Sequence, residues 1–159
     1  EKFEIENNNY ELIELGKAKI VKEGKDLTIV AFSIMVGKCL EAAKILQEKG
    51  VDIEIIDLRT IKPLDQDLII QSVKKTNRLL VVDEDVPGGA SAYIMQKIVE
   101  QQNAYVFLDS EPKTLTAKEH RPPYGKDGDY FSKPSSEDVF EKVYALINEV
   151  NPSKFPSLY

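Results

Sequence analysis

Residues 51–65 read VDIEIIDLRTIKPLD. The first eight of them alternate acidic and apolar side chains, which is the period of a strand with one wetter face or end. Pro63 cannot continue that strand, and the residue before a proline is held away from helical geometry. Asp65 can then cap a helix over residues 66–76. The stretch therefore predicts a strand, a rigid corner and a helix, in that order.

The same alternation of strands and helices extends in both directions from this corner. Short apolar runs rich in β-branched residues predict strands that are buried on both faces, and apolar residues at helical spacing predict the segments between them. Gly50 can end the first helix. The predicted order is strand 27–33, helix 36–49, strand 51–58, helix 66–76, strand 78–83, a helix from the loop VPGGAS to about residue 100, and strand 104–108.

Repeats of strand, helix and strand form largely parallel sheets with helices on both faces. We expect an α/β fold, a three-layer domain with a mostly parallel five-stranded sheet that includes one antiparallel strand, at about residues 16–21. Ser135 and Asp138 have the spacing of a capping box before a final amphipathic helix. The predicted divisions are an interdomain linker over residues 1–15, the domain over residues 16–150 and a docked tail over residues 151–159.

Composition and charge exclude several classes of function. The 159 residues carry a net charge of −6, which disfavours a nucleic acid or an anionic membrane surface as a partner. No apolar run in the sequence approaches the ~20 residues that span a bilayer. Cys39 is the single cysteine, and its place in an apolar helix indicates a buried side chain rather than a nucleophile. Such a chain suits a reducing compartment, the cytoplasm or, in a eukaryote, the mitochondrial matrix.

Two loops are candidates for ligand binding. VPGGAS, residues 86–91, precedes a helix whose free N–H groups could bind an anion, but the acidic run at residues 83–85 would repel a phosphate. It also lacks the glycine spacing of a dinucleotide site, so we interpret it as a tight structural turn. GKDGDY, residues 125–130, could supply metal-binding carboxylates, although aspartate and glycine in such segments usually form turns.

Residues 111–134 are rich in proline and predict a long surface excursion. His120, the only histidine, lies within it and has no positioned partner of the kind that a general acid or base needs. We therefore interpret it as a surface histidine. The sequence contains no P-loop, metal-ligand cluster or serine elbow. On its residues alone, the domain shows no self-sufficient catalytic constellation.

Arg59 stands at the corner that follows the strand of residues 51–58. Its guanidinium carries five donors, which can pair with Asp57 or Asp65 in the corner or face another chain. An exposed arginine held by a rigid corner suits an interface. We therefore predict that Arg59 forms an ion pair at the corner or across a subunit interface.

A resemblance to a known family covers about residues 12–150, in order and without large gaps. It is carried by LGKAKIVKEGKDLTIVAFSIMVGKCLEAAKILQEKGVDIEIIDLRTIKPLD and by IIQSVKKTNRLLVVDED. These stretches are similar to the C-terminal domain of the transketolase superfamily, and more closely to the beta subunit of the decarboxylating component of pyruvate and branched-chain 2-oxo acid dehydrogenases. FLDSEP resembles the Leu-Asp-Ala-Pro segment of that subunit, and RPPY its Pro-x-Pro-Tyr segment.

The resemblance implies the C-terminal structural and assembly domain of an enzyme that decarboxylates a 2-oxo acid oxidatively and transfers the acyl group to a lipoyl arm. In such enzymes thiamine diphosphate and magnesium lie between two upstream domains. This chain alone is therefore expected to hold no cofactor, no metal and no catalytic residue. GKDGDY also has the order Asp-Gly-Asp where thiamine enzymes have Gly-Asp-Gly. The alternatives are the C-terminal domain of a transketolase or deoxyxylulose-phosphate synthase, and a nucleotide-binding α/β domain.

The resemblance also implies partners, namely other domains or subunits of the same enzyme and the acyltransferase core of its complex. Asp109 matches the aspartate of the Leu-Asp-Ala-Pro segment, in a region that contacts the small subunit-binding domain of the acyltransferase. Tyr159, at the end of an apolar tail, is a further candidate for this contact. The alternative is that Asp109 caps a turn and that the tail packs on its own domain.

Overall fold

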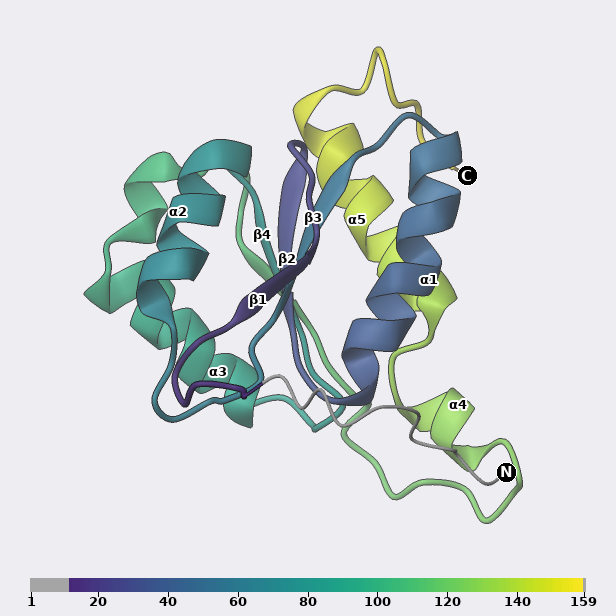
Figure 1. Ribbon diagram of the computed structural model, residues 1–159. Coiled ribbons are helices and arrows are strands. Elements are labelled where there is room, and N and C mark those ends of the chain that lie inside the picture. The colour runs from purple at the N-terminus through teal and green to yellow at the C-terminus, as the bar shows by residue number, and fades with distance from the viewer. Residues whose placement is uncertain (1–11, 159) are drawn as a thin grey trace.

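The computed structural model describes residues 12–158, which form one sheet between two layers of helices (Figure 1). The sheet has five strands in the order β1-β3-β2-β4-β5. β1 runs antiparallel to β3, and the other neighbouring strands are parallel. This arrangement confirms the predicted fold class. The strands are β1 (Lys19–Lys22), β2 (Leu27–Ala31), β3 (Ile53–Asp57), β4 (Leu79–Val82) and β5 (Lys113–Leu115).

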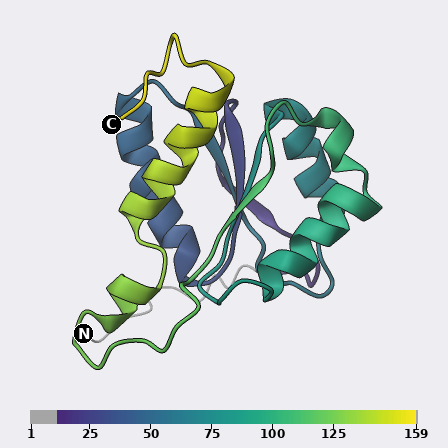
Figure 2. The same ribbon diagram turned by 180° about the vertical axis from the view of Figure 1, so that it is seen from behind.

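Helices cover both faces of the sheet (Figure 2). The first and last long helices lie on one face, and the helices between β3 and β5 lie on the other. The third helix passes directly into a π-helical turn. The helices are α1 (Ile34–Glu48), α2 (Gln66–Thr76), α3 (Ala90–Met95), the π-helix η1 (Gln96–Gln101), the 3-10 helix η2 (Ala104–Phe107), α4 (Gly128–Ser132) and α5 (Ser136–Val150).

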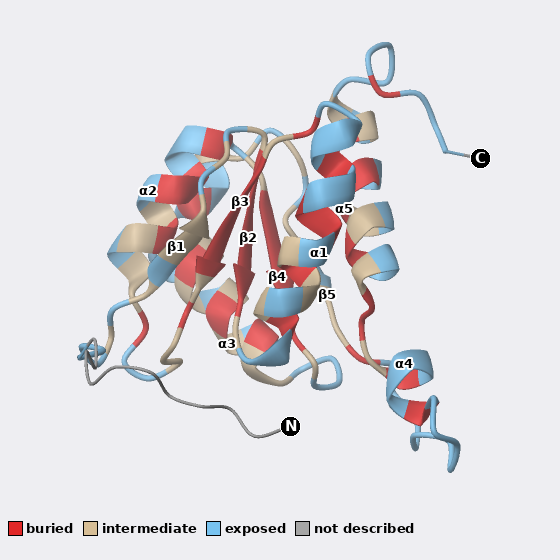
Figure 3. Ribbon diagram, turned by 45° about the vertical axis from the view of Figure 1, so that its right-hand side comes forward, coloured by how far each residue is buried: buried red, intermediate tan, exposed pale blue. Residues whose placement is uncertain are grey.

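The central strands are buried on both faces, which explains their continuous apolar runs (Figure 3). Successive side chains of a strand point to opposite faces. Ile29 of β2 therefore packs in the core beneath α1 and α5, whereas Val30 packs in the core beneath α2 and α3. Both side chains are fully buried. The two cores hold the sheet rigidly and fix where each strand ends.

The helix caps follow the residues that the sequence indicates. Asp65 Oδ1 accepts a hydrogen bond from the Leu68 N–H at 3.2 Å. Ser135 Oγ accepts one from the Asp138 N–H at 3.1 Å, and Asp138 Oδ2 accepts one from the Ser135 N–H at 2.8 Å. Gly50 ends α1 with φ +77°. Each side-chain cap contributes about 1 kcal/mol, so the boundaries of α2 and α5 are set locally.

The prediction of a strand over residues 104–108 is wrong. Ala104–Phe107 form the 3-10 helix η2, in which Tyr105 and Val106 are largely exposed. The fifth strand is instead Lys113–Leu115, inside the segment that was expected to be a surface excursion. An apolar run of this length does not distinguish a strand from a helical turn, and an edge strand can be short and polar.

The C-terminal tail packs on its own domain. The side chain of Phe155 is buried, and its carbonyl oxygen accepts a hydrogen bond from Asn148 Nδ2 at 2.6 Å. Its ring meets Tyr144 edge to face, with the ring centroids 6.3 Å apart. Residues 1–11 of the predicted linker and Tyr159 lie outside the described residues. Among the helices of residues 12–158, none combines the length and the apolar character that crossing a membrane requires.

Candidate interaction surfaces

The candidate residues lie at the two ends of the parallel strands. β2, β3, β4 and β5 begin at one edge of the sheet and end at the other, where open α/β sheets commonly bind ligands. We call the edge at which these strands end the carboxyl edge; it is formed by residues 12–18, 32–34, 58–63, 83–87 and 116–133. We call the edge at which they begin the amino edge; it is formed by residues 23–26, 49–52, 76–78 and 108–112.

The corner after β3 is rigid, as its sequence indicates. The Arg59 backbone has φ +56°, and its N–H donates to Asp57 Oδ1 at 3.1 Å. Thr60 Oγ1 donates to the Pro63 carbonyl at 2.9 Å and accepts from the Gly16 N–H at 3.0 Å. The corner is therefore fixed both within itself and to the segment that leads into β1.

The Arg59 guanidinium is half-buried and forms no ion pair with any carboxylate of residues 12–158. Asp57 is engaged by the Arg59 backbone rather than by its side chain. Asp65 caps α2 and accepts the Ala18 N–H with its second oxygen, at 3.0 Å. The two carboxylates that could have paired with Arg59 inside the corner thus have other roles, and the interface alternative stays a prediction.

A row of polar contacts crosses the carboxyl edge from β2 to the excursion. Ser33, which follows β2 with φ +55°, donates its hydroxyl to Glu84 Oε1 at 3.1 Å. Lys133 Nζ donates to Glu84 Oε2 at 3.2 Å. This hydrogen bond raises the pKa of Lys133. The sequence did not single out these three residues, because their neighbourhood depends on the order of strands in the sheet.

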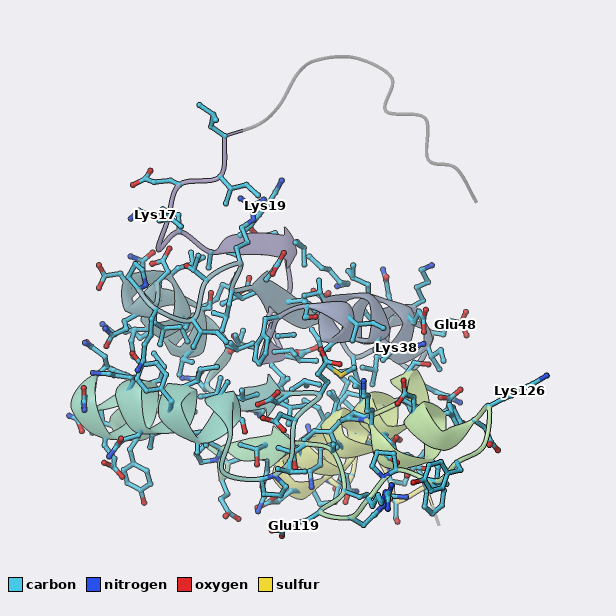
Figure 4. The ribbon with its side chains drawn as sticks, turned by 90° about the horizontal axis from the view of Figure 1, so that it is seen from below. Lys17, Lys19, Lys38, Glu48, Glu119 and Lys126 are labelled. Carbon is cyan, nitrogen blue, oxygen red and sulfur yellow. The ribbon has the colours of Figure 1, made fainter. Side chains whose placement is uncertain are left out.

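The excursion projects from the carboxyl edge, with Lys126 at its outer end (Figure 4). Lys118 Nζ lies 4.1 Å from the centroid of the Phe131 ring, and His120 packs against the same ring. His120 Nδ1 is 2.9 Å from the Arg121 carbonyl oxygen. These contacts agree with the prediction of a surface histidine. GKDGDY forms a turn and the start of α4, and residues 12–158 contain no group of three potential metal ligands.

The loop VPGGAS is occupied by a carboxylate of the protein itself. Asp83 is buried, and its Oδ2 accepts the Ser91 N–H at 2.9 Å while its Oδ1 accepts the Asp85 N–H at 3.0 Å. An anion would have to displace this carboxylate from the helix N-terminus. The geometry therefore agrees with a structural turn and speaks against a phosphate site or a nucleotide-binding domain.

Asp109 lies at the amino edge and is already paired within the chain. Its Oδ2 is 2.6 Å from Arg78 Nη2, and its N–H donates to the Asn77 carbonyl at 3.0 Å. Arg78 Nη1 also donates to the Asp26 carbonyl at 2.8 Å. A shallow groove beside Asp109 combines apolar and acidic side chains. It is lined by Tyr105, Val106, Leu108, Asp109, Ser110, Glu111, Pro112 and Glu149.

Sequence reasoning missed a charge cluster around a buried glutamate. Glu54 was expected on a wetter face of its strand, but its side chain is fully buried and pairs with Lys75 of α2. Lys75 also pairs with Glu23 at 3.0 Å, and this hydrogen bond lowers the pKa of Glu23. Burial alone would lower the pKa of Lys75, but the hydrogen bonds and charges of both glutamates outweigh it and raise that pKa. The only sign of this cluster in the sequence is that Glu54 stands between two isoleucines, Ile53 and Ile55.

Cys39 has no role in chemistry at either edge. It lies inside the core beneath α1, and burial raises the pKa of its thiol to about 12. A thiol that stays protonated at neutral pH is a poor nucleophile. The prediction of a buried structural cysteine is confirmed.

Comparison with known proteins relates the sequence of this chain to one family. Residues 16–139 match the model of the transketolase C-terminal domain. A Rickettsia felis protein named pyruvate dehydrogenase E1 component subunit beta is 44% identical over 134 residues, and a mitochondrial subunit beta-1 of that name from Oryza sativa subsp. japonica is 42% identical over 126 residues. The matches cover 84% and 79% of this chain but only 40% and 33% of those two relatives.

Solved structures show the same fold. A split-gene transketolase, described as an inactive beta4 tetramer, superposes with a TM-score of 0.68 at 26% identity, over 86% of this chain and 43% of that one. A transketolase from Pichia stipitis superposes with a TM-score of 0.59 at 14% identity, over 91% of this chain and 20% of that one. With most of its described residues inside the matched range, this chain belongs to the transketolase C-terminal domain family.

Proposed function

We propose that this chain is the C-terminal structural and assembly domain of a thiamine-diphosphate-dependent 2-oxo acid dehydrogenase. The observation that carries the proposal is the 44% identity over 134 residues to a pyruvate dehydrogenase E1 subunit beta. The chain spans about two fifths of that relative's length, so the decarboxylation of the 2-oxo acid and the acyl transfer to a lipoyl arm belong to the whole enzyme. Two plant relatives are named mitochondrial, and on this proposal the enzyme of a eukaryote would work in the mitochondrial matrix and that of a bacterium in the cytoplasm.

The residues of this domain do not fit thiamine diphosphate and magnesium. A diphosphate needs free backbone N–H groups or cations, but at the glycine-rich start of α3 the Asp83 carboxylate already accepts the Ser91 N–H. Glu84 and Asp85 add negative charge beside it. Within residues 12–158 no three carboxylate, histidine or cysteine side chains gather as a metal site would require. The cofactor is therefore assigned to the other domains, and no step of the reaction is assigned to this one.

The acyltransferase core is the proposed partner of the groove beside Asp109. Tyr105 and Val106 are 70% and 61% exposed, and Asp109, Glu111 and Glu149 line the same groove. An apolar floor with an acidic rim suits a small basic domain that brings apolar side chains with its lysines or arginines. Because Asp109 is paired with Arg78, a partner cation would share this carboxylate rather than find it vacant.

The experiment for this function uses the full-length enzyme together with its acyltransferase. We expect decarboxylation of pyruvate or a branched-chain 2-oxo acid when thiamine diphosphate and magnesium are added. We expect no turnover by residues 1–159 alone, and no micromolar cofactor binding to them by calorimetry. Turnover by the isolated chain, or a full-length enzyme that turns over no 2-oxo acid, would contradict the proposal.

The docking part is tested separately, by titrating full-length enzyme with the subunit-binding domain of the acyltransferase. We expect salt-sensitive association that Asp109→Asn weakens. The matched control is Asp67→Asn, an exposed aspartate in the first turn of α2. Equal binding by the wild-type and Asp109→Asn enzymes at low salt would defeat this assignment.

A second candidate function is the C-terminal domain of a transketolase, which the similarity to the split-gene transketolase favours. The same activity experiment separates the two, because a transketolase transfers a two-carbon unit between sugar phosphates and needs no lipoyl acceptor. Turnover of a ketose phosphate with an aldose acceptor, without 2-oxo acid decarboxylation, would select this alternative.

A further inference from the structure

We propose that the carboxyl edge is the surface on which the preceding domain of the same polypeptide docks, and that this domain brings a carboxylate to Arg59. The inference rests on the proposed function, because it takes the chain to be the C-terminal part of a longer subunit. It goes beyond that function by naming the buried surface and the charge that its partner must carry.

Exposed apolar side chains concentrate at this edge. Of the twelve large apolar side chains exposed within residues 12–158, eight lie here, although the domain has two well-filled cores beneath its helices. A soluble protein rarely leaves so large a group uncovered unless another surface packs on it. The eight are Leu12, Ile13, Leu15, Ile34, Val86, Tyr124, Tyr130 and Phe131.

These side chains extend across the whole edge rather than around one element. Ile34 begins α1 directly after β2, and Val86 follows β4, the neighbour of β2 in the sheet. Tyr130 and Phe131 come from the excursion, which the contact of Lys133 with Glu84 fixes to the end of β4. The segment leading into β1 adds Leu12–Leu15 at the other end. The result is a broad surface with exposed apolar residues on four of the five segments that form it, the fifth being the corner that carries Arg59.

The path of the chain identifies what covers this surface. The Gly16 N–H binds Thr60 and the Ala18 N–H binds Asp65, so the segment before β1 is fixed to the corner of the carboxyl edge. Polypeptide that precedes this segment is therefore tethered beside the exposed surface. A short tether gives an effective concentration on the order of millimolar, which favours docking in cis over association with a second copy.

Charge specifies the second feature of the partner. The Arg59 guanidinium is half-buried on a rigid corner and has no ion-pair partner among residues 12–158. The corner of residues 58–63 is part of the carboxyl edge, so a domain that covers this edge would remove water from the donors of Arg59 and must supply an acceptor. A carboxylate can accept two of these donors side by side. The expected partner face is apolar, with an aspartate or glutamate opposite Arg59.

Hydrogen exchange on the full-length polypeptide and on residues 1–159 tests the docking. The amides of Ile34 and Met35, which begin α1, have no intrahelical acceptor, so their exchange reports on what covers them. We expect amides 34–35 and 128–133 to exchange at least about tenfold more slowly in the full-length protein, with no change for η2. Equal exchange in both proteins would overturn the proposal. Slowing within the isolated chain that grows with its concentration would identify a second copy as the occupant instead, and would overturn it too.

Two isoleucines on the same helix give a matched pair of variants. Ile34 is 58% exposed at the carboxyl edge, and Ile45 is 43% exposed roughly 16 Å further along α1. In the full-length protein, Ile34→Gln should accelerate limited proteolysis of the segment before Gly16 several-fold, and Ile45→Gln should not. Both variants should leave the melting temperature of the isolated chain nearly unchanged. An equal effect of both on proteolysis would overturn the proposal.

The outcome is independent of whether the proposed activity is right. Protected amides at the carboxyl edge in a protein that decarboxylates no 2-oxo acid would refute the proposed function and still support the docking. An active 2-oxo acid dehydrogenase with unprotected amides at this edge would do the reverse.

Discussion

The amino and carboxyl edges of the sheet use charged residues in different ways. At the amino edge charges find partners inside the domain: Lys22 pairs with Asp52 at 2.9 Å, and Arg78 pairs with Asp109 at 2.6 Å. At the carboxyl edge Arg59 has no such partner among residues 12–158, and eight exposed apolar side chains lie on the other segments of that edge. The two amino-edge cations thus pair within the domain, whereas Arg59 at the carboxyl edge is available to the partner that we propose.

The backbones of the two edges differ in the same sense. Glycine apart, the left-handed residue of the amino edge is Asn77, which ends α2, and asparagine tolerates this conformation well. At the carboxyl edge the left-handed residues are Ser33 and Arg59, whose side chains do not favour it. Such positions cost on the order of 1–3 kcal/mol and tend to occur where function uses the geometry. Strain and unpaired charge thus occur together at one edge.

The largest loss of stability is expected from breaking the charge cluster of Glu23, Glu54 and Lys75 near the amino edge. Lys75→Met keeps the aliphatic stem but leaves the fully buried Glu54 carboxylate without its cation. Removing one partner of a fully buried pair costs about 3–5 kcal/mol, and we expect the lower end of that range because the Lys75 side chain is 42% exposed to water. Urea unfolding of the isolated chain at pH 7 measures this loss. Lys74→Met is the control, since the exposed Lys74 makes only a cation–π contact with Phe107, and it should cost at most ~1 kcal/mol. Equal losses would contradict the internal pairing.

The same cluster gives a pH dependence with a defined sign. The pKa of Glu23 is lowered from its ordinary 4.5, so its stabilisation is complete above that value and is lost as the pH falls through the folded-state pKa. The pKa of Lys75 is raised from 10.5, so its contribution persists below 10.5 and is lost only in stronger alkali. We expect the difference between wild type and Lys75→Met to shrink between pH 7 and pH 4. A difference that grows on acidification would contradict this assignment.

Local signals in the sequence predict much of the fold. Asp65 and the Ser135–Asp138 pair mark the starts of helices. A helix cap joins residues only three positions apart, so it can be recognised from the sequence. Apolar runs mark β2 and β4 because strands buried on both faces have no alternation. The run at residues 104–108 misleads, because its exposed Tyr105 and Val106 cannot be told from core residues without the structure.

The candidate surfaces depend on contacts between distant residues, which the sequence does not display. Lys75 of α2 pairs with Glu54 of β3 only because the fold brings this helix against the sheet. Ser33 meets Glu84 only because β2 and β4 are neighbours in the sheet although β3 lies between them in the chain. Arg59 was identified because its corner is a local feature, whereas the lack of a partner for it is not.

An intermediate loss of stability is expected from replacing Arg78 at the amino edge. Its guanidinium is 16% exposed and binds both the Asp26 carbonyl and the Asp109 carboxylate. Hydrogen bonds to charged groups contribute about 1.5–3 kcal/mol, so Arg78→Met should destabilise the isolated chain by that amount. Asp109→Asn should cost less than ~1 kcal/mol, because the carboxylate is 41% exposed and the amide keeps an acceptor. Thermal melts of both variants rank them, and the reverse order would contradict the pairing.

A small gain in stability is expected from relieving the backbone strain of Ser33 at the carboxyl edge. Ser33 has φ +55° and ψ −141°, a region populated mainly by glycine. Ser33→Gly should therefore stabilise the isolated chain by roughly 0.5–1 kcal/mol, after the loss of its exposed hydrogen bond to Glu84. Asn77→Gly at the amino edge should change stability by only a few tenths of a kcal/mol. A larger gain at Asn77 than at Ser33 would show that strain does not distinguish the two edges.

The smallest effect in the isolated chain is expected for Arg59→Ala, and its size depends on the state of the protein. With no ion pair to lose among residues 12–158, the variant should unfold within ~1 kcal/mol of wild type. Alanine keeps the same backbone hydrogen bond to Asp57, so the corner itself should persist. In the full-length enzyme the same change would leave a carboxylate of the covering domain buried without its cation, at a cost of up to ~3–5 kcal/mol. Melting temperatures and subunit association of wild type and variant, measured in both forms, give the two values to compare. A full-length enzyme as insensitive to Arg59→Ala as the isolated chain would remove Arg59 from the interface, and the apolar surface around it would then have to act without a charge pair.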